Sequence, residues 1–218
     1  MSHPPIAITP EYKTLVFFPT YNEAGNVKKL LAGIWTACPT ANVLVIDDNS
    51  TDGTGALLKE MALHEPKLSV IHRPRKLGLG SAHFMAMFYA IENNYDRLVT
   101  MDADLSHDPA DIPRLLSALD DSDFVTGSRY MPGGSCDYSG YRKQLSVVAN
   151  FSARLLTGVK VHEFTTSFRG FKIKPLSKVK FNWVGNYGYS FFLESIVRLH
   201  SAGLTIQEIP IHFYNRHS

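Results

Sequence analysis

The sequence predicts an α/β fold in which helices cover both faces of a mostly parallel β-sheet. Two observations lead to this prediction: short apolar runs that suit buried strands recur along the first part of the chain, and segments with helical periodicity alternate with them. With 218 residues, of which 44% are hydrophobic and 19% charged, the chain can bury one substantial core. We therefore expect a single domain that spans residues 1–218.

Apolar runs mark the strands of the predicted sheet. They are Thr14–Phe18, Val43–Ile46, Leu68–Ile71, Leu98–Met101 and Phe124–Thr126. Strands of a parallel sheet are covered on both faces, so they read as continuous apolar runs rather than as an alternating pattern. In such sheets ligands bind beyond the carboxyl ends of the strands, and we expect the functional residues there.

Three segments between these runs repeat apolar residues at helical spacing. Their centres are Val27-Leu30-Leu31-Ile34, Ala82-Met85-Ala86-Ala90 and Ile112-Leu115-Leu116-Leu119. Residues spaced in this way share one side of a helix, so each segment predicts a helix that packs one apolar face on the sheet.

The pattern changes after Tyr130. A Gly-rich loop over Met131–Gly140 precedes a predicted amphipathic helix over Arg142–Thr157, and a basic stretch continues to Lys180. The apolar residues of this helix suit either the core or a membrane interface, and we favour the core. They are Leu145, Val148, Ala149, Leu155 and Leu156.

The last part of the chain is expected to form a helix from about Tyr189 to Ser201 and an edge strand within Leu204–Phe213. Pro210 cannot donate a ladder hydrogen bond, which suits an edge or a bulge. No linker separates these elements from the first part of the chain, so we expect them to extend the same sheet.

Charge is distributed unevenly along the chain. Residues 1–138 carry 11 Lys and Arg against 17 Asp and Glu, net −6, whereas residues 139–218 carry 11 against 3, net +8. A basic segment attracts phosphates of a nucleic acid, a lipid surface or a small ligand, or is simply a solvated face. We do not expect a nucleic-acid partner, because the aromatic residues form no evident stacking platform for a single strand.

Cysteine spacing and hydropathy indicate the compartment. Cys38 and Cys136 match no metal-ligand or disulfide spacing, and the sequence begins without the apolar core of a signal peptide. No stretch approaches the roughly 18 consecutive apolar residues of a membrane span. We expect a cytoplasmic protein that does not cross the bilayer.

A polar cluster follows each of the first two predicted strands. The clusters are Pro19–Glu23 and Asp47–Ser50. A nucleoside needs an apolar or aromatic wall and a few fixed hydrogen-bond partners, which this region can supply. The candidates are Tyr21, Glu23, Ile46 and Asp48. Ordinary turn chemistry is the alternative, because Asp, Asn and Gly are common in turns.

Asp102-Ala103-Asp104 directly follows the fourth predicted strand and is the strongest chemical signal. While the backbone stays extended, residues two apart point to the same side, so Asp102, Asp104 and Ser106 would present oxygens to one point. Two carboxylates so close together repel each other unless a cation lies between them. Mg²⁺ takes one or two carboxylates and completes its shell with water and phosphates. The motif therefore predicts a site for a divalent metal and the diphosphate of a nucleotide-activated sugar, with a solvated carboxylate pair as the alternative.

Arg129 follows the fifth predicted strand and would reach the same rim. Its guanidinium suits phosphate oxygens, and a structural ion pair with the acidic half of the chain is the alternative. The nine histidines match no metal-ligand spacing, so we expect them to be scattered core or surface residues.

Several motifs occur in an order that resembles dolichol-phosphate mannose synthases over nearly the whole chain. They are Phe-Pro-Thr-Tyr-Asn-Glu from Phe18, Ile-Asp-Asp-Asn-Ser-x-Asp-Gly-Thr from Ile46, Lys-Leu-Gly-Leu-Gly from Lys76, Met-Asp-Ala-Asp-Leu-Ser-His-Asp-Pro from Met101 and Gly-Ser-Arg-Tyr from Gly127. The resemblance implies a GT-A (Rossmann-like) fold. It also implies an inverting transfer of mannose from GDP-mannose to a polyprenyl phosphate, with Mg²⁺ or Mn²⁺, by a protein peripheral to the cytoplasmic face of a membrane.

The resemblance further implies a nucleotide-sugar-binding half over 1–130 and a basic half over 131–218 that faces the acceptor and the membrane. Two alternatives stay open. One is a UDP-sugar donor, such as UDP-glucose, with the same acceptor. The other is a non-catalytic protein that binds a nucleotide sugar at a membrane.

Residue roles follow from the resemblance position by position. The nucleoside would contact Pro19, Tyr21, Glu23, Ile46 and Asp48, and the metal and diphosphate would contact Asp102, Ala103, Asp104 and Ser106. Arg129 and Arg216 would bind phosphate, and Asp104 and Arg129 are the expected catalytic residues. Arg169 is the candidate for the acceptor phosphate, which is already anionic at neutral pH and needs no general base. Family members usually continue past the position of Arg216 with a Gly-x-Ser-Lys segment, whereas this sequence stops at Ser218, so we expect that phosphate contact to be missing.

Overall fold

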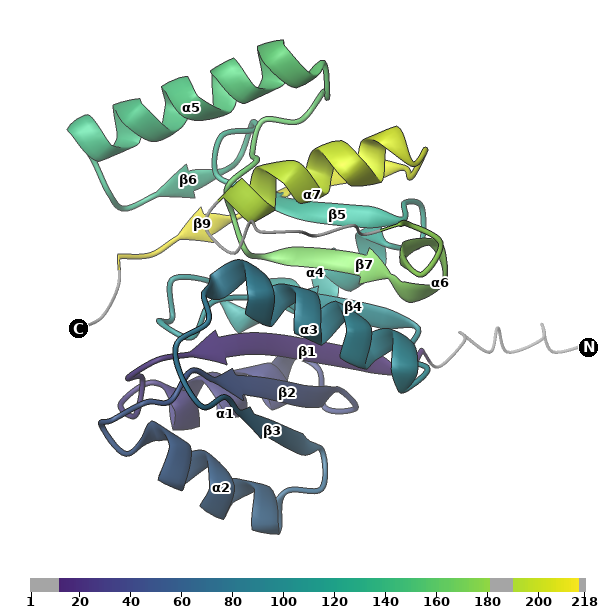
Figure 1. Ribbon diagram of the computed structural model, residues 1–218. Coiled ribbons are helices and arrows are strands. Elements are labelled where there is room, and N and C mark those ends of the chain that lie inside the picture. The colour runs from purple at the N-terminus through teal and green to yellow at the C-terminus, as the bar shows by residue number, and fades with distance from the viewer. Residues whose placement is uncertain (1–11, 181–189, 216–218) are drawn as a thin grey trace, which may run out of the picture.

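A seven-stranded sheet organises the chain in the computed structural model, which describes residues 12–180 and 190–215 (Figure 1). Its strand order is β3-β2-β1-β4-β7-β5-β8, and every neighbouring pair is parallel except the two that involve β7. The strands are β1 (Thr14–Thr20), β2 (Asn42–Asp47), β3 (Leu68–His72), β4 (Arg97–Thr100), β5 (Phe124–Ser128), β7 (Arg169–Lys172) and β8 (Ile206–Pro210). The predicted α/β fold with a mostly parallel sheet is confirmed.

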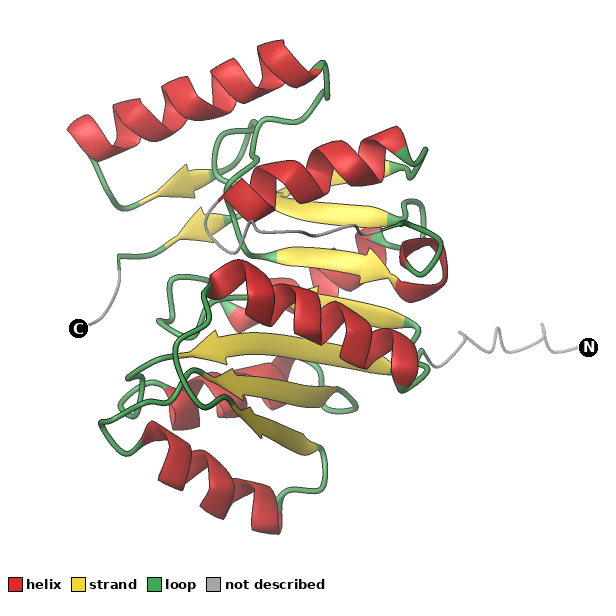
Figure 2. Cartoon of the chain, in the orientation of Figure 1, coloured by secondary structure: helices red, strands yellow, loops and turns green. Residues whose placement is uncertain are grey.

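Helices cover both faces of the sheet (Figure 2). Leu15 and Phe17 of β1 pack in one core cluster with residues of α3 and α7, while Val16 and Phe18 pack in the other with residues of α1 and α4. Successive side chains of a strand point to opposite faces, which is why one apolar run serves both clusters. The helices are α1 (Val27–Ala37), α2 (Thr54–His64), α3 (Leu79–Glu92), η1 (Pro109–Asp111), α4 (Ile112–Ala118), α5 (Tyr141–Thr157), α6 (Ile173–Leu176) and α7 (Ser190–Ser201).

The basic third of the chain contributes two strands to this sheet. β7 lies antiparallel between β4 and β5, and β8 pairs with the outer side of β5 and ends at Pro210. The expected edge strand is therefore present, and the expected extension of the same sheet is observed. A second, two-stranded sheet joins β6 (Ser135–Cys136) to β9 (His212–Phe213).

Helix α5 lies at the outside of the molecule, apart from the main sheet (Figure 1). Of the α5 side chains that the structure describes, only Asn150 and Ala153 are buried. Its apolar side chains are exposed, Leu145 by 56% and Leu156 by 85%, with Val148, Ala149 and Leu155 also exposed. The expectation that these residues pack in the core is wrong, because the buried side of α5 carries Asn150 and Ala153 instead.

Within residues 12–180 and 190–215, no helix combines the length and the apolar character needed to cross a membrane.

Candidate functional site

A cavity of about 690 Å³ opens at the carboxyl ends of β1, β2 and β4. This is the edge at which ligands bind in parallel α/β sheets. Most of the predicted site residues line it, and they come from separate strand ends. They are Pro19, Tyr21, Glu23, Asp48, Asp102, Ala103, Asp104 and Arg129.

Hydrogen bonds tie together the loops after β1 and β2. The side-chain oxygen of Asn22 accepts from the backbone N–H of Thr51 at 2.8 Å, and the N–H of Asn22 donates to Ser50 Oγ at 2.9 Å. Asn22 and Asn49 have φ of 60° and 62°, a left-handed conformation that asparagine tolerates better than most residues. These contacts fix the positions of Tyr21 and Asp48 at the cavity.

Arg73, for which the sequence analysis gave no role, supports the cavity wall next to Asp48. Its buried guanidinium forms an ion pair with Asp48 and donates to Ser81 Oγ at 2.6 Å and to the Gly78 carbonyl at 3.2 Å. The end of β2 is thereby held against the start of α3. The ammonium of Lys76 lies 3.9 Å from the centre of the Tyr21 ring at the same rim.

The loop after β4 carries the two carboxylates, but it is not extended. β4 ends at Thr100, Leu105 adopts the left-handed region with φ of 61°, and the N–H of Ser106 turns back to Asp104 Oδ1 at 3.0 Å. Asp102 and Asp104 both line the cavity, whereas Ser106 does not. The expected presentation of all three oxygens to one point is wrong for Ser106, because the turn replaces the extended backbone on which it depended.

The residues present fit a divalent cation that also contacts a diphosphate. Asp102 and Asp104 both line the cavity, and the carboxylate of Asp104 is held by the N–H of Ser106. The described part of the chain contains no cluster of three or more His, Cys, Asp or Glu side chains that would hold a metal alone. Two carboxylates with phosphates and water completing the shell are the arrangement that Mg²⁺ prefers at nucleotide sites.

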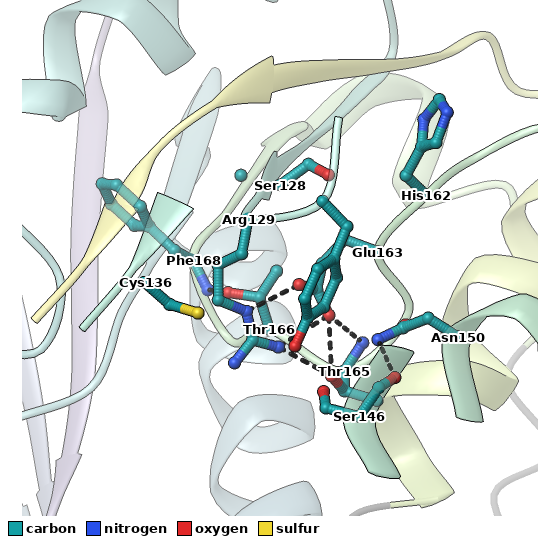
Figure 3. A network of polar contacts seen from close by, with 12 residues as sticks. Ser128, Arg129, Cys136, Ser146, Asn150, His162, Glu163, Thr165, Thr166 and Phe168 are labelled. Atoms are coloured by element: carbon teal, nitrogen blue, oxygen red, sulfur yellow. Dashed lines mark hydrogen bonds and ion pairs between the residues drawn. The ribbon is translucent and has the colours of Figure 1, made fainter. Parts of the chain in front are cut away.

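Arg129 enters the cavity wall from the end of β5 and is held by a buried glutamate (Figure 3). Its Nε and Nη2 donate to the two oxygens of Glu163 at 2.7 and 2.8 Å. Nη2 also donates to Thr165 Oγ1 at 2.9 Å, and Nη1 donates to the hydroxyl of Tyr138 at 2.7 Å. Four of the five guanidinium N–H groups are thus engaged. The ion pair given as the alternative role of Arg129 is present, although its partner lies in the basic half.

The ion pair between Arg129 and Glu163 determines the protonation state of both side chains. Burial alone would raise the pKa of Glu163, but the hydrogen bonds and charge of Arg129 outweigh it, and that pKa lies below its ordinary value. Burial alone would lower the pKa of Arg129, but the hydrogen bonds and charge of Glu163 outweigh this effect, and the pKa of Arg129 lies above its ordinary value. Both groups are therefore charged at neutral pH, as a mutually compensated buried pair requires.

Asn150 connects α5 to this network. Its Oδ1 accepts the backbone N–H of Phe164 at 2.7 Å, next to Glu163 in the chain, and its Nδ2 donates to the Ser146 carbonyl within α5 at 2.9 Å. Glu208 of β8 accepts the N–H of Glu163 at 3.0 Å from the other side. One hydrogen bond, from the Phe164 N–H to Asn150, therefore joins the exposed helix to the segment that carries Glu163.

Two further predicted residues do not line the cavity, and a third is outside the described residues. Ile46 is fully buried in the core on the α3 face, and Arg216 lies outside the described residues. Arg169 is 1% exposed, and its guanidinium donates to Ser195 Oγ and to the carbonyls of Phe164, Thr166 and Phe192. Burial lowers the pKa of Arg169 to about 9. The structure does not support Arg169 as the acceptor-phosphate ligand, because its guanidinium is buried in the core and, unlike that of Arg129, does not line the cavity.

Sequence reasoning missed Glu163, which positions Arg129 from behind the cavity wall, and Ser167, which lines the cavity. Glu163 is one of only three acidic residues in a segment of net charge +8, and that isolation was a usable signal. Ser167 lines the cavity with a buried hydroxyl that has no partner among the described residues, and nothing in the sequence distinguished it from other serines.

Comparison with known proteins finds relatives over nearly the whole chain. The chain is 40% identical over 215 residues to a polyprenol monophosphomannose synthase of Mycolicibacterium smegmatis, covering 97% of this chain and 81% of the relative. It is 36% identical over 205 residues to an undecaprenyl-phosphate mannosyltransferase of Micrococcus luteus, covering 94% of this chain and 84% of the relative.

Solved structures of lower identity share the fold. A glucosyl-3-phosphoglycerate synthase of Mycobacterium tuberculosis, in complex with Mn²⁺, UDP and product, is 18% identical with a TM-score of 0.66, covering 95% of this chain and 72% of that one. A mannosyltransferase of Pyrobaculum calidifontis, in complex with GDP-mannose and Mn²⁺, is 18% identical with a TM-score of 0.62, covering 95% and 58%. The profile named Glycosyl transferase family 2 matches residues 15–180, and together with the curated relatives it shows that the chain belongs to glycosyltransferase family 2.

Proposed function

We propose that this protein transfers mannose from GDP-mannose to a polyprenyl phosphate at a membrane surface, using Mg²⁺ or Mn²⁺. One observation carries the proposal: a single cavity joins the paired carboxylates Asp102 and Asp104 to Arg129, and Ser146 of the exposed apolar helix α5 lines the same cavity. The relatives named above act on mannose and polyprenyl acceptors, which supports this choice of substrates.

The donor would lie along the cavity from β1 to β4. Tyr21, Glu23 and Asp48 supply a ring face and hydrogen-bonding carboxylates for the nucleoside. Asp102 and Asp104 would hold the divalent cation, which when bound neutralises charge on the departing diphosphate. The chain's own contribution is to place the anomeric carbon and to exclude water, since positioning alone supplies a large part of such barriers.

The acceptor phosphate is its own nucleophile, because it is anionic at neutral pH. We assign to Arg129 the task of stabilising phosphate charge through the one N–H that makes no hydrogen bond among the described residues. Arg129 is held on three sides, so its guanidinium does not need to reorganise when the phosphate arrives.

Helix α5 would bring the cavity to the lipid. Its exposed apolar side chains are accompanied by Lys143, Arg154 and Lys160, and no acidic residue occurs between Asp137 and Glu163. Such a helix suits the interface of a membrane with anionic headgroups, to which each nearby Lys or Arg contributes about 1 kcal/mol. We place the protein on the cytoplasmic face of that membrane, as the family resemblance implies.

A donor panel tests the proposal. The protein is incubated with Mg²⁺, vesicles that contain a polyprenyl phosphate, and either radiolabelled GDP-mannose or radiolabelled UDP-glucose. We expect labelled lipid from GDP-mannose, and competition by unlabelled GDP stronger than by UDP. If only UDP-glucose gives labelled lipid, the donor is UDP-glucose and not GDP-mannose. If the protein binds nucleotide but transfers no sugar, it is a non-catalytic protein.

A further inference from the structure

His107 belongs to the loop of the two carboxylates, but neither the metal nor the acceptor proposal gives it a role. It lines the cavity and is only 1% exposed. Its ring stacks on Phe168 with centres 5.0 Å apart and meets the Phe213 ring edge-on at 5.2 Å. The imidazole is therefore fixed between two segments that are distant from it in the sequence.

Both ring nitrogens face polar atoms. The backbone N–H of Asp102 lies 3.2 Å from Nδ1, and Thr166 Oγ1 lies 3.4 Å from Nε2. A backbone N–H can only donate, so Nδ1 accepts and carries no proton in this arrangement. The ring proton then resides on Nε2 and points to Thr166.

The loop needs such support, because its backbone is not in a relaxed conformation. The backbone of Leu105 lies in the left-handed region, which residues other than glycine, asparagine and aspartate rarely adopt. Such a backbone conformation persists only where contacts with the surrounding structure hold it in place. A bridge between His107 and Phe213 and the hydrogen bond from the N–H of Tyr214 to the Ser106 carbonyl, 3.0 Å long, hold the far end of the loop. At the near end, the described contact to the Asp102 N–H comes from His107.

We propose that His107 is a positioning residue, which fixes the backbone of Asp102 so that its carboxylate meets the divalent cation. This inference rests on the proposed metal site. Nδ1 is 3.8 Å from Asp102 Oδ2 and is already engaged with the Asp102 N–H, so His107 acts through Asp102 and not as a ligand. Residues that orient metal ligands typically change metal affinity by about 10- to 100-fold when they are replaced.

Three substitutions of His107 distinguish the role of Nδ1 from that of Nε2. His107→Asn places an oxygen near the position of Nδ1 and keeps the acceptor for the Asp102 N–H. His107→Gln places an amide near Nε2 and loses that acceptor, and His107→Phe keeps the ring contacts but has neither nitrogen. The control is His83→Gln, because His83 is the other fully buried histidine among the described residues. It lies among three phenylalanine rings, and the structure shows no hydrogen bond between it and this loop.

The measurement is Mn²⁺ affinity in the presence of GDP, followed by electron paramagnetic resonance, with thermal unfolding as a check of the fold. We expect His107→Gln and His107→Phe to bind Mn²⁺ about tenfold more weakly or worse. His107→Asn and His83→Gln should stay close to wild type. If His107→Gln does not fold, the ring-preserving His107→Phe carries the test.

Two results would overturn the inference: wild-type Mn²⁺ affinity in a folded His107→Gln or His107→Phe variant, or an equal loss in His107→Asn. Because the readout is metal binding, it separates this inference from the proposed reaction. Wild-type protein that binds Mn²⁺ with GDP but transfers no mannose would contradict the reaction and leave the role of His107 intact. Wild-type protein that does not bind Mn²⁺ would overturn both.

Discussion

At the scale of single residues, the Arg129–Glu163 pair dominates the described site. Both side chains are almost fully buried, and four hydrogen bonds surround the guanidinium. A buried pair adds little net stability compared with apolar residues of the same size, but removal of one partner leaves an uncompensated charge. The pair is therefore better explained by the placement of Arg129 than by stability.

Glu163→Gln should destabilise the fold by about 3–5 kcal/mol and lower transfer activity, because Arg129 would remain charged without its partner. Urea unfolding measures the first effect and the KM for polyprenyl phosphate the second. The matched control is Glu194→Gln, which removes the half-exposed pair with Arg198 and should cost less than about 1 kcal/mol. Equal stability losses in the two variants would contradict this account.

Asp104→Asn and Asp102→Asn should each reduce mannose transfer by about 100-fold, because stabilisation of the leaving diphosphate by a metal amounts to several kcal/mol. Initial rates at saturating GDP-mannose measure the effect. Asp108→Asn is the control in the same loop, since Asp108 accepts the Ala110 N–H at 2.9 Å and asparagine caps equally well. Loss of activity in Asp108→Asn alone would place the metal elsewhere.

The buried side chain of His83 makes the stability of the fold depend on pH. Burial, reinforced by the charges of Arg169 and His107, lowers the pKa of His83 to about 3. An unfolded histidine titrates near about 6.5, so between these values the unfolded state binds more protons and stability falls as the pH falls. From about pH 6.5 to about pH 5 this costs about 2 kcal/mol.

His83→Leu should remove that contribution, and urea unfolding at several pH values measures it. The stability of the variant should fall less steeply on acidification than that of wild type. Parallel curves for the two proteins would show that His83 is protonated within the folded state.

At the scale of elements, α5 determines the proposed contact with lipid. Replacing Leu155 and Leu156 together by glutamine should weaken binding to anionic vesicles at least about tenfold, because each leucine contributes about 1.5–3 kcal/mol on burial. Co-sedimentation measures this, and thermal unfolding should be unchanged because both side chains are exposed. The control is Leu63→Gln on α2, a leucine that is 77% exposed on another element. Equal vesicle binding by all three proteins would exclude α5 as the docking element.

Elements that bury a continuous apolar face were predictable, whereas β7 and α2, which do not, were missed. β7 is Arg-Gly-Phe-Lys and buries a charged side chain, so no apolar run marks it. Helix α2 buries only Thr54 and Leu58, which leaves almost no helical periodicity to detect. The periodicity of α5 was visible, but it does not tell whether an apolar face meets the core or a membrane.

At the scale of the whole molecule, the two oppositely charged parts of the chain meet at the carboxyl edge of one sheet. The acidic part supplies Asp48, Asp102 and Asp104, and the basic part supplies Glu163 and α5. The cavity residues that end strands were predictable, because parallel topology brings such ends together. The contacts Arg129–Glu163 and Asp102–His107 were not predictable, since contacts between and within loops depend on turns that apolar patterns do not encode.

Metal-dependent mannose transfer is measured by the initial rate from radiolabelled GDP-mannose to polyprenyl phosphate in vesicles, with Mn²⁺ and again with a metal chelator in excess. We expect labelled lipid with Mn²⁺, and almost none with chelator or with Asp104→Asn. Absence of labelled lipid from the wild-type protein with any polyprenyl phosphate, or an equal rate in the presence of chelator, would contradict the proposed function.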